Sequence, residues 1–227
     1  MSEPLKKPGQ VPESYQPQKP EMMRALEAAQ VETMPIYKGK KKNASFQIDI
    51  FHIDQPLYAV GRTVRVTHGA PDCFPKIDAL IKDFGDDDVP SAISDKTSPI
   101  IAFGICLDHI DHGGNQIEFT YMRAILVREL PTEVQLPEGM LCHTIPAGYY
   151  ARNHVCAKNI GDALGTAYVE LDNWLKSSEG WESCGNGEYE VFTSSVYNPE
   201  TRRFEHTHKP KKYEMEKWGQ VRRKTQQ

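Results

Sequence analysis

The stretch "GEYEVFTSSVYNPE", residues 187–200, places an acidic side chain next to an aromatic one. Its alternation predicts a strand with Tyr189 and Val191 on one side and Glu190 and Phe192 on the other. A carboxylate among aromatic rings can bind a lipophilic cation, because ring faces attract the cation and the carboxylate supplies the opposite charge. A solvated strand face with one incidental exposed ring is the alternative interpretation of this pattern.

The segments around this stretch alternate between strand and helix patterns. Apolar residues at helical spacing predict one helix over residues 75–85 and a second from Asn159, a suitable N-cap, to Ser178. Extended segments precede each helix, and a hairpin follows each one, the last around "YNPET". The order strand, helix, strand, strand therefore occurs twice.

A local sequence match supports an internal duplication. "IDQPLYA" (53–59) and "IPAGYYA" (145–151) share the spacing Ile-x4-Tyr-Ala. With the repeated element order, the match predicts an α+β fold of tandem β-α-β-β repeats related by a pseudo-twofold axis. The repeats would form an antiparallel sheet with helices on one face and a concave ligand groove on the other. Tyr189 and Val191 would then pack under the second helix, and Glu190 and Phe192 would face the groove.

Further aromatic residues are candidates for the walls of this groove. With Glu190 as the anionic anchor, the predicted ligand-binding residues are Phe192, Tyr121, Tyr150, Trp174 and Trp181. Trp174 also lies on the apolar stripe of the second helix, so a position in the core is the alternative.

Composition sets the class of protein and the domain limits. The 227 residues are 26% charged and 39% hydrophobic, which is ordinary for a globular protein, and five scattered cysteines without a CxxC pair favour reduced thiols in the cytoplasm. No apolar run approaches the roughly 18 residues of a membrane span. Residues 1–44 are predicted to be a disordered extension rich in Pro and Lys, 45–210 the folded domain, and 211–227 a basic tail.

Two polar clusters offer weaker chemistry. "DHIDHGG" carries His109 and His112 in a predicted turn, which is too few converging ligands for a metal, so we expect no metal and no cofactor. His154 and Cys156 could form a nucleophile pair, but a buried structural thiol is the commoner arrangement. The sequence contains no phosphate loop and no nucleotide fingerprint.

Three segments resemble the GyrI-like domain, the effector-binding domain of many AraC- and MerR-type regulators. These are "LPEGMLCHTIPAGYYARNHV", "AYVELDNWLKSSEGWE" and "EYEVF". The resemblance implies the tandem β-α-β-β fold, and it assigns to Glu190 the strand glutamate that pairs with lipophilic cations in multidrug-sensing members. Two departures leave the ligand preference open. "RNHVCAKN" replaces a hydrophobic or glycine-rich segment, and Phe192 stands where the family commonly has Tyr.

The resemblance implies a stand-alone sensor that binds a small, lipophilic, cationic molecule. One alternative is a hydrolase of strained electrophilic molecules, with Glu190 as general base. Another is a module that binds a protein partner, as the gyrase inhibitor does. No helix-turn-helix pattern precedes the domain, so we expect no direct DNA binding, and no membrane partner.

Overall fold

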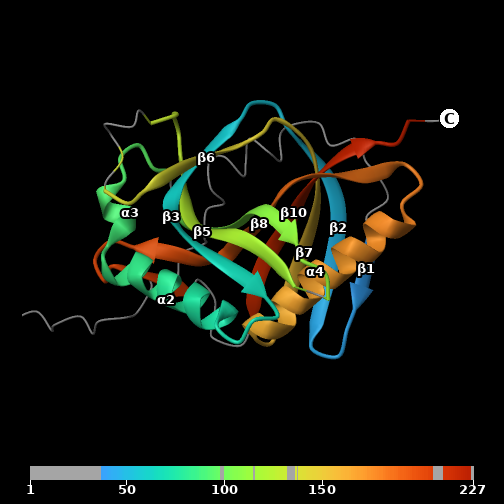
Figure 1. Cartoon of the computed structure of the whole chain (residues 1–227), viewed down its shortest axis with the longest axis horizontal. Coiled ribbons are helices and arrows are strands. Elements are labelled where there is room, and N and C mark those ends of the chain that lie inside the picture. Colours follow the sequence, from blue (N-terminus) through green and yellow to red (C-terminus); the bar gives the residue numbers. More distant parts are fainter. Residues whose placement is uncertain are drawn as a thin grey trace, which may run out of the picture.

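The computed structural model describes residues 37–97, 100–114, 116–131, 136, 138–206 and 212–225. Its helices and strands are arranged as in Figure 1. The strands are β1 (Tyr37–Lys40), β2 (Ala44–Ile53), β3 (Leu57–His68), β4 (Ile101–Asp111), β5 (Ile117–Val127), β6 (Leu141–Ile145), β7 (Gly148–Ala157), β8 (Trp181–Asn198), β9 (Arg203–His206) and β10 (Tyr213–Arg223). The helices of the described residues are α2 (Cys73–Asp86), α3 (Val89–Ala92) and α4 (Ile160–Ser177).

The strands form one ten-stranded antiparallel sheet in the order β1-β2-β7-β10-β8-β4-β5-β3-β6, and β9 pairs with β8. The pairing of β4 with β8 joins its two halves. One half contains β7, β8 and β10 from the later part of the chain, and β2 from the earlier part pairs with β7. The other half contains β3, β4 and β5, and the later strand β6 pairs with β3. A large antiparallel sheet with three helices in the described part of the chain confirms the predicted α+β class.

Both long helices cover the same face of the sheet (Figure 1). At the start of α4, the Asn159 side chain accepts a hydrogen bond of 2.8 Å from the backbone N–H of Asp162, as the sequence predicted. Ala163, Ala167 and Leu171 then pack on β2, β7 and β10. Helix α2 packs in the same way on β3 and β5.

The opposite face carries a buried cluster where the sequence predicted an open groove. Tyr189 and Val191 of β8 belong to this cluster and are fully buried there. Ile53 and Ile145 come from strands near opposite ends of the strand order, yet both pack into it, so the sheet is strongly curved. The predicted orientation of β8 is therefore wrong: its apolar pair faces away from α4, and Glu190 faces the helices.

Both predicted boundaries of the folded domain also need correction. The first strand begins at Tyr37, inside the predicted extension, whereas residues 1–36 lie outside the described residues. The segment predicted as a basic tail contains β10, which lies between β7 and β8. Met215 and Trp218 of this strand are each 1% exposed. The charges of the segment obscured its apolar residues, which lie on both faces of the strand, as in a central strand.

No helix in the described part of the chain is long and apolar enough to cross a membrane.

Candidate functional site

Strand register places four unusual residues side by side on the helix face. Glu190 of β8 lies opposite Lys217 of β10 on one side and Gly104 of β4 on the other, and Gly104 lies opposite Arg123 of β5. The Glu190 side chain is buried, with 7% exposure. This row, called the polar row below, crosses the centre of the sheet.

Two tyrosine hydroxyls donate to the Glu190 carboxylate. Tyr121 Oη lies 3.2 Å from Oε2, and Tyr168 Oη of α4 lies 2.8 Å from Oε1. Burial, and next the negative charge of Glu190, raise the pKa of both tyrosines well above the usual value. Both phenols therefore stay protonated and act as neutral donors to the carboxylate.

Gly104 makes room for this arrangement. A Cβ atom at this position would lie 2.4 Å from Tyr121 Oη and 2.5 Å from Glu190 Oε2. Contacts this short do not occur between real side chains, so a larger residue would displace the phenol and the carboxylate. The glycine thus provides the space in which Glu190 meets Tyr121.

Arg123 lies at the far end of the polar row and is 6% exposed. Its guanidinium carbon lies 4.7 Å from the ring centroid of Phe192 and 5.4 Å from that of Phe204. Burial lowers the pKa of Arg123, while Tyr121 and Glu190 act in the opposite direction. Phe192, predicted as a ligand wall, instead covers this buried cation.

Lys217 lies at the other end and is even less exposed, at 2%. Its Nζ lies 3.8 Å from the ring centroid of Tyr168 and 2.8 Å from Glu188 Oε2. The Tyr168 ring therefore contacts the ammonium with its face and the Glu190 carboxylate with its hydroxyl.

A cavity of about 630 Å³ adjoins this end of the polar row, between α4 and the strands β8 and β10. Its lining residues include Leu171, Asp172 and Leu175 of α4, Glu188 of β8, Lys217 and Gly219 of β10, and His109. Burial raises the pKa of Asp172, with Glu188 adding to the effect. Since Lys217 lines the cavity and contacts Tyr168, this tyrosine connects the cavity wall to Glu190.

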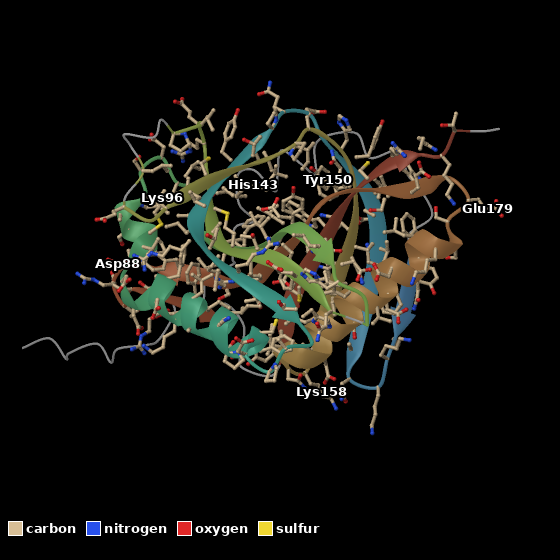
Figure 2. All side chains as sticks on the ribbon, viewed as in Figure 1. Asp88, Lys96, His143, Tyr150, Lys158 and Glu179 are labelled. Atoms are coloured by element: carbon tan, nitrogen blue, oxygen red, sulfur yellow. The ribbon has the colours of Figure 1, made fainter. Side chains whose placement is uncertain are left out.

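The structure brings together only part of the predicted site. Tyr121 contacts Glu190, as described above. Tyr150 lies on the opposite face, where its hydroxyl donates to the carbonyl oxygen of Pro146 at 2.7 Å (Figure 2). Trp174 packs against the apolar cluster that α4 forms with β2, β7 and β10. Trp181 belongs to this cluster and is 2% exposed. Tyr150 and Trp181 are therefore core residues that do not contact Glu190.

Four residues of the site were missed from the sequence. Tyr168 lies on the apolar stripe of α4, where the spacing alone indicates a core residue, although its hydroxyl needs a partner when buried. Lys217 was assigned to a tail. Gly104 and Arg123 each lie inside a strand pattern, and nothing near them in the sequence marks them as site residues. The glycine alone could have suggested that another group approaches the strand backbone closely there.

The site offers neither a metal centre nor an activated thiol. Among the described residues, no group of three or more His, Cys, Asp or Glu side chains could hold a metal ion. Cys106 Sγ lies 3.7 Å from Tyr168 Oη, but burial raises the pKa of this thiol, and the neighbouring Glu190 raises it further. Cys106 is therefore a neutral thiol and a poor nucleophile.

The sequence matches the family model of Cass2, the integron-associated effector binding protein, over residues 55–218. The chain belongs to this family. Curated protein sequences give no match. The family match agrees with the predicted resemblance to effector-binding domains.

Solved structures share the fold at low sequence identity. An integron cassette protein from the mobile metagenome of Vibrio cholerae is 14% identical, with a TM-score of 0.51 over 83% of this chain and 100% of the other. SAV2435 bound to tetraphenylphosphonium is 14% identical, with a TM-score of 0.53 over 77% and 93% of the two chains. EcmrR, in a complex with DNA, is 16% identical, with a TM-score of 0.52 over 78% and 57%.

Proposed function

We propose that this effector-binding protein binds a small lipophilic cation and that Glu190 supplies the opposite charge. The observation that carries the proposal is a buried carboxylate held by neutral donors. Its hydrogen bonds come from Tyr121 and Tyr168, and in the described part of the chain no basic side chain forms an ion pair with it. Arg123 and Lys217 lie near Glu190 in the polar row without forming an ion pair with it. A buried carboxylate without a direct ion pair is costly, and a bound cation would lower that cost.

The cavity between α4 and β10 supplies the volume for an apolar ligand. About 630 Å³ lies within the range of small-molecule sites, and Leu171 and Leu175 provide apolar wall. Rotation of Tyr168 would open a path from this cavity to Glu190. The cation would then replace the Tyr168 hydroxyl at Oε1, and Tyr121 would keep its hydrogen bond to Oε2.

The comparisons support a cationic ligand and a sensor role. SAV2435, which shares the fold, was solved with tetraphenylphosphonium, a lipophilic cation. EcmrR, which also shares it, was solved in a complex with DNA. We propose by analogy that ligand occupancy of this chain is read by a transcription regulator or another protein partner.

We further propose that the sheet arose from two tandem repeats related by a pseudo-twofold axis. The strand order supports this proposal, since β7-β10-β8 mirrors β3-β5-β4 in both position and chain order, and β2 and β6 flank them at equivalent positions. The axis would pass between β4 and β8, next to Gly104 and Glu190. Equivalent positions in the two repeats would then carry a glycine and a glutamate, which gives the carboxylate its free space.

Titration with tetraphenylphosphonium tests the function. Intrinsic tryptophan fluorescence would be followed for wild type, Glu190→Gln and the control Glu179→Gln, an exposed glutamate just after α4 (Figure 2). We expect saturable binding that Glu190→Gln weakens at least about 30-fold, because loss of one partner of a desolvated charge pair costs about 2–5 kcal/mol. The control should bind like wild type.

Two results would contradict the proposal. Equal affinity of wild type and Glu190→Gln would remove the role of the carboxylate. Equal affinity for the neutral analogue triphenylphosphine oxide would remove the preference for cations. Mass spectrometry of each mixture would detect consumption of the ligand, which would favour the hydrolase instead.

A further inference from the structure

The chain already carries a cation at the entrance to the Glu190 site. Lys217 Nζ lies over the Tyr168 ring at 3.8 Å from its centroid and pairs with Glu188 at 2.8 Å. A ring face together with a carboxylate is also the arrangement that recognises a lipophilic cation. The ligand-free protein thus fills such an arrangement with its own ammonium.

The position of this lysine is unusual for a structural ion pair. Its side chain is 2% exposed, whereas that of Glu188 is 37% exposed. Lysine is rarely so fully buried, and burial of an ammonium is unfavourable unless specific contacts offset it. Those contacts are the Tyr168 ring and Glu188, and both residues are adjacent to the cavity proposed for the ligand.

We infer that Lys217 is a specificity-determining residue that acts as a tethered competitor of the cationic ligand. The inference rests on the proposed function. A ligand cation that reaches Glu190 through Tyr168 must displace Nζ from the ring or bind beside a like charge. Either route weakens binding of simple monocations and selects those with enough apolar surface to offset the cost.

Lysine is suited to such a role. Its flexible four-carbon stem allows Nζ to withdraw, and Glu188 can move with it because its side chain reaches solvent. The opposite strand position holds Glu190, so the ammonium and the anchor carboxylate are cross-strand neighbours. Removal of the ammonium would leave both glutamates free to attract a cation.

The test measures tetraphenylphosphonium affinity of the full chain in four proteins. These are wild type, Lys217→Met, Lys217→Arg and the control Lys212→Met, which removes the same charge from an exposed position just before β10. Methionine matches the length of the lysine stem without its charge. We expect Lys217→Met to bind at least about tenfold more tightly. The repulsion between two like unit charges at close range near a protein surface corresponds to a loss of affinity larger than tenfold, and the variant removes this repulsion. Lys217→Arg should not gain affinity, and Lys212→Met should stay within about twofold of wild type.

Combination with Glu190→Gln separates the two proposals. If Glu190→Gln weakens binding but Lys217→Met binds no more tightly than wild type, the competitor role is overturned and the proposed function stands. If Glu190→Gln has no effect in either background, the proposed function fails. If Lys217→Met does not fold, as judged by its thermal unfolding transition, Lys217→Gln takes its place with the same expected gain.

Discussion

Two buried glutamates on neighbouring strands differ in how their charge is balanced. Glu190 of β8 is 7% exposed and faces the helices, whereas Glu216 of β10 is 5% exposed and faces the opposite side of the sheet. Glu190 receives hydrogen bonds from two neutral phenols. Glu216 receives one from Trp218 Nε1 at 2.8 Å and lies close to two basic side chains.

The surroundings of Glu216 form a complete counter-charge. His154 Nδ1 lies 3.6 Å from Oε1, and Arg152 lies 3.8 Å from the same atom while it also pairs with Asp49 at 2.8 Å. Burial alone would raise the pKa of Glu216, but His154, Arg152 and Trp218 together outweigh it and hold the pKa below its usual value. Glu216 is therefore a satisfied structural carboxylate.

The difference separates a structural charge from the charge that we propose binds a ligand. Burial does not distinguish the two glutamates, because Glu190 and Glu216 are removed from water to a similar extent. The contacts with basic side chains make the distinction: Glu216 lies within 3.8 Å of Arg152 and His154, whereas Arg123 and Lys217 lie near Glu190 in the polar row without pairing with it. The predictions below test this comparison in order of decreasing effect.

Neutralising each glutamate in turn gives the largest contrast. Glu216→Gln should lower the free energy of unfolding by about 2–3 kcal/mol, because Arg152 and His154 lose a buried partner. Glu190→Gln should lower it by less than about 1 kcal/mol, because one phenol can still donate to the amide oxygen, the other can accept from the amide NH2, and no charge remains to be buried. Urea unfolding at pH 7 measures both values. Equal losses would show that both glutamates are structural.

Closing the space beside Glu190 should affect binding more than stability. Gly104→Ala pushes on the ends of two side chains, Tyr121 and Glu190, which can move away. We expect tetraphenylphosphonium affinity to fall about tenfold or more, because the carboxylate leaves its position. Gly165→Ala is the control, since a Cβ on this exposed part of α4 meets nothing within 4 Å. It should leave affinity unchanged and stabilise the helix by about 0.5–1 kcal/mol. Unchanged affinity in Gly104→Ala would contradict the assigned site.

The smallest expected effect is a pH dependence that comes from the Glu216 side. The Glu216 carboxylate raises the pKa of His154 in the folded state, although burial opposes this shift. The resulting stabilisation is full below the unfolded pKa of about 6.5 and is lost as the pH rises through the folded pKa. His154 is 43% exposed, so solvent screening limits the effect to less than about 1 kcal/mol.

Urea unfolding of wild type and His154→Gln from pH 5 to pH 9 measures this effect. The variant should lose the decline in stability that wild type shows above neutral pH. His68→Gln, at the exposed end of β3, should keep it. The same decline in both variants would assign it to another group.

The sequence predicted the elements that local signals define. Asn159 marks the start of α4, and the alternation around Glu190 identified both the strand and its acidic residue. The face of β8 could not be predicted in the same way. Both faces of this central strand are buried, so the apolar pair Tyr189 and Val191 did not reveal which side carries the helices.

The partners of Glu190 depend on contacts between distant segments. Tyr121, Tyr168 and Gly104 meet the carboxylate only because β5, α4 and β4 converge on β8. Strand alternation places residues on a face, but it does not fix which strands are neighbours. Lys217 was missed for a different reason, since the charged composition of its segment gave no sign that the strand lies between two others in the sheet.

The place of β10 in the sheet also determines when the protein can fold during synthesis. This strand follows all others in the chain, yet it separates β7 from β8. Until residues 213–223 have left the ribosome, both neighbours keep unpaired edges and neither side of the sheet can complete its core. The decisive step of folding is therefore the insertion of β10 between β7 and β8, and one edge of each of these two strands stays open until it occurs.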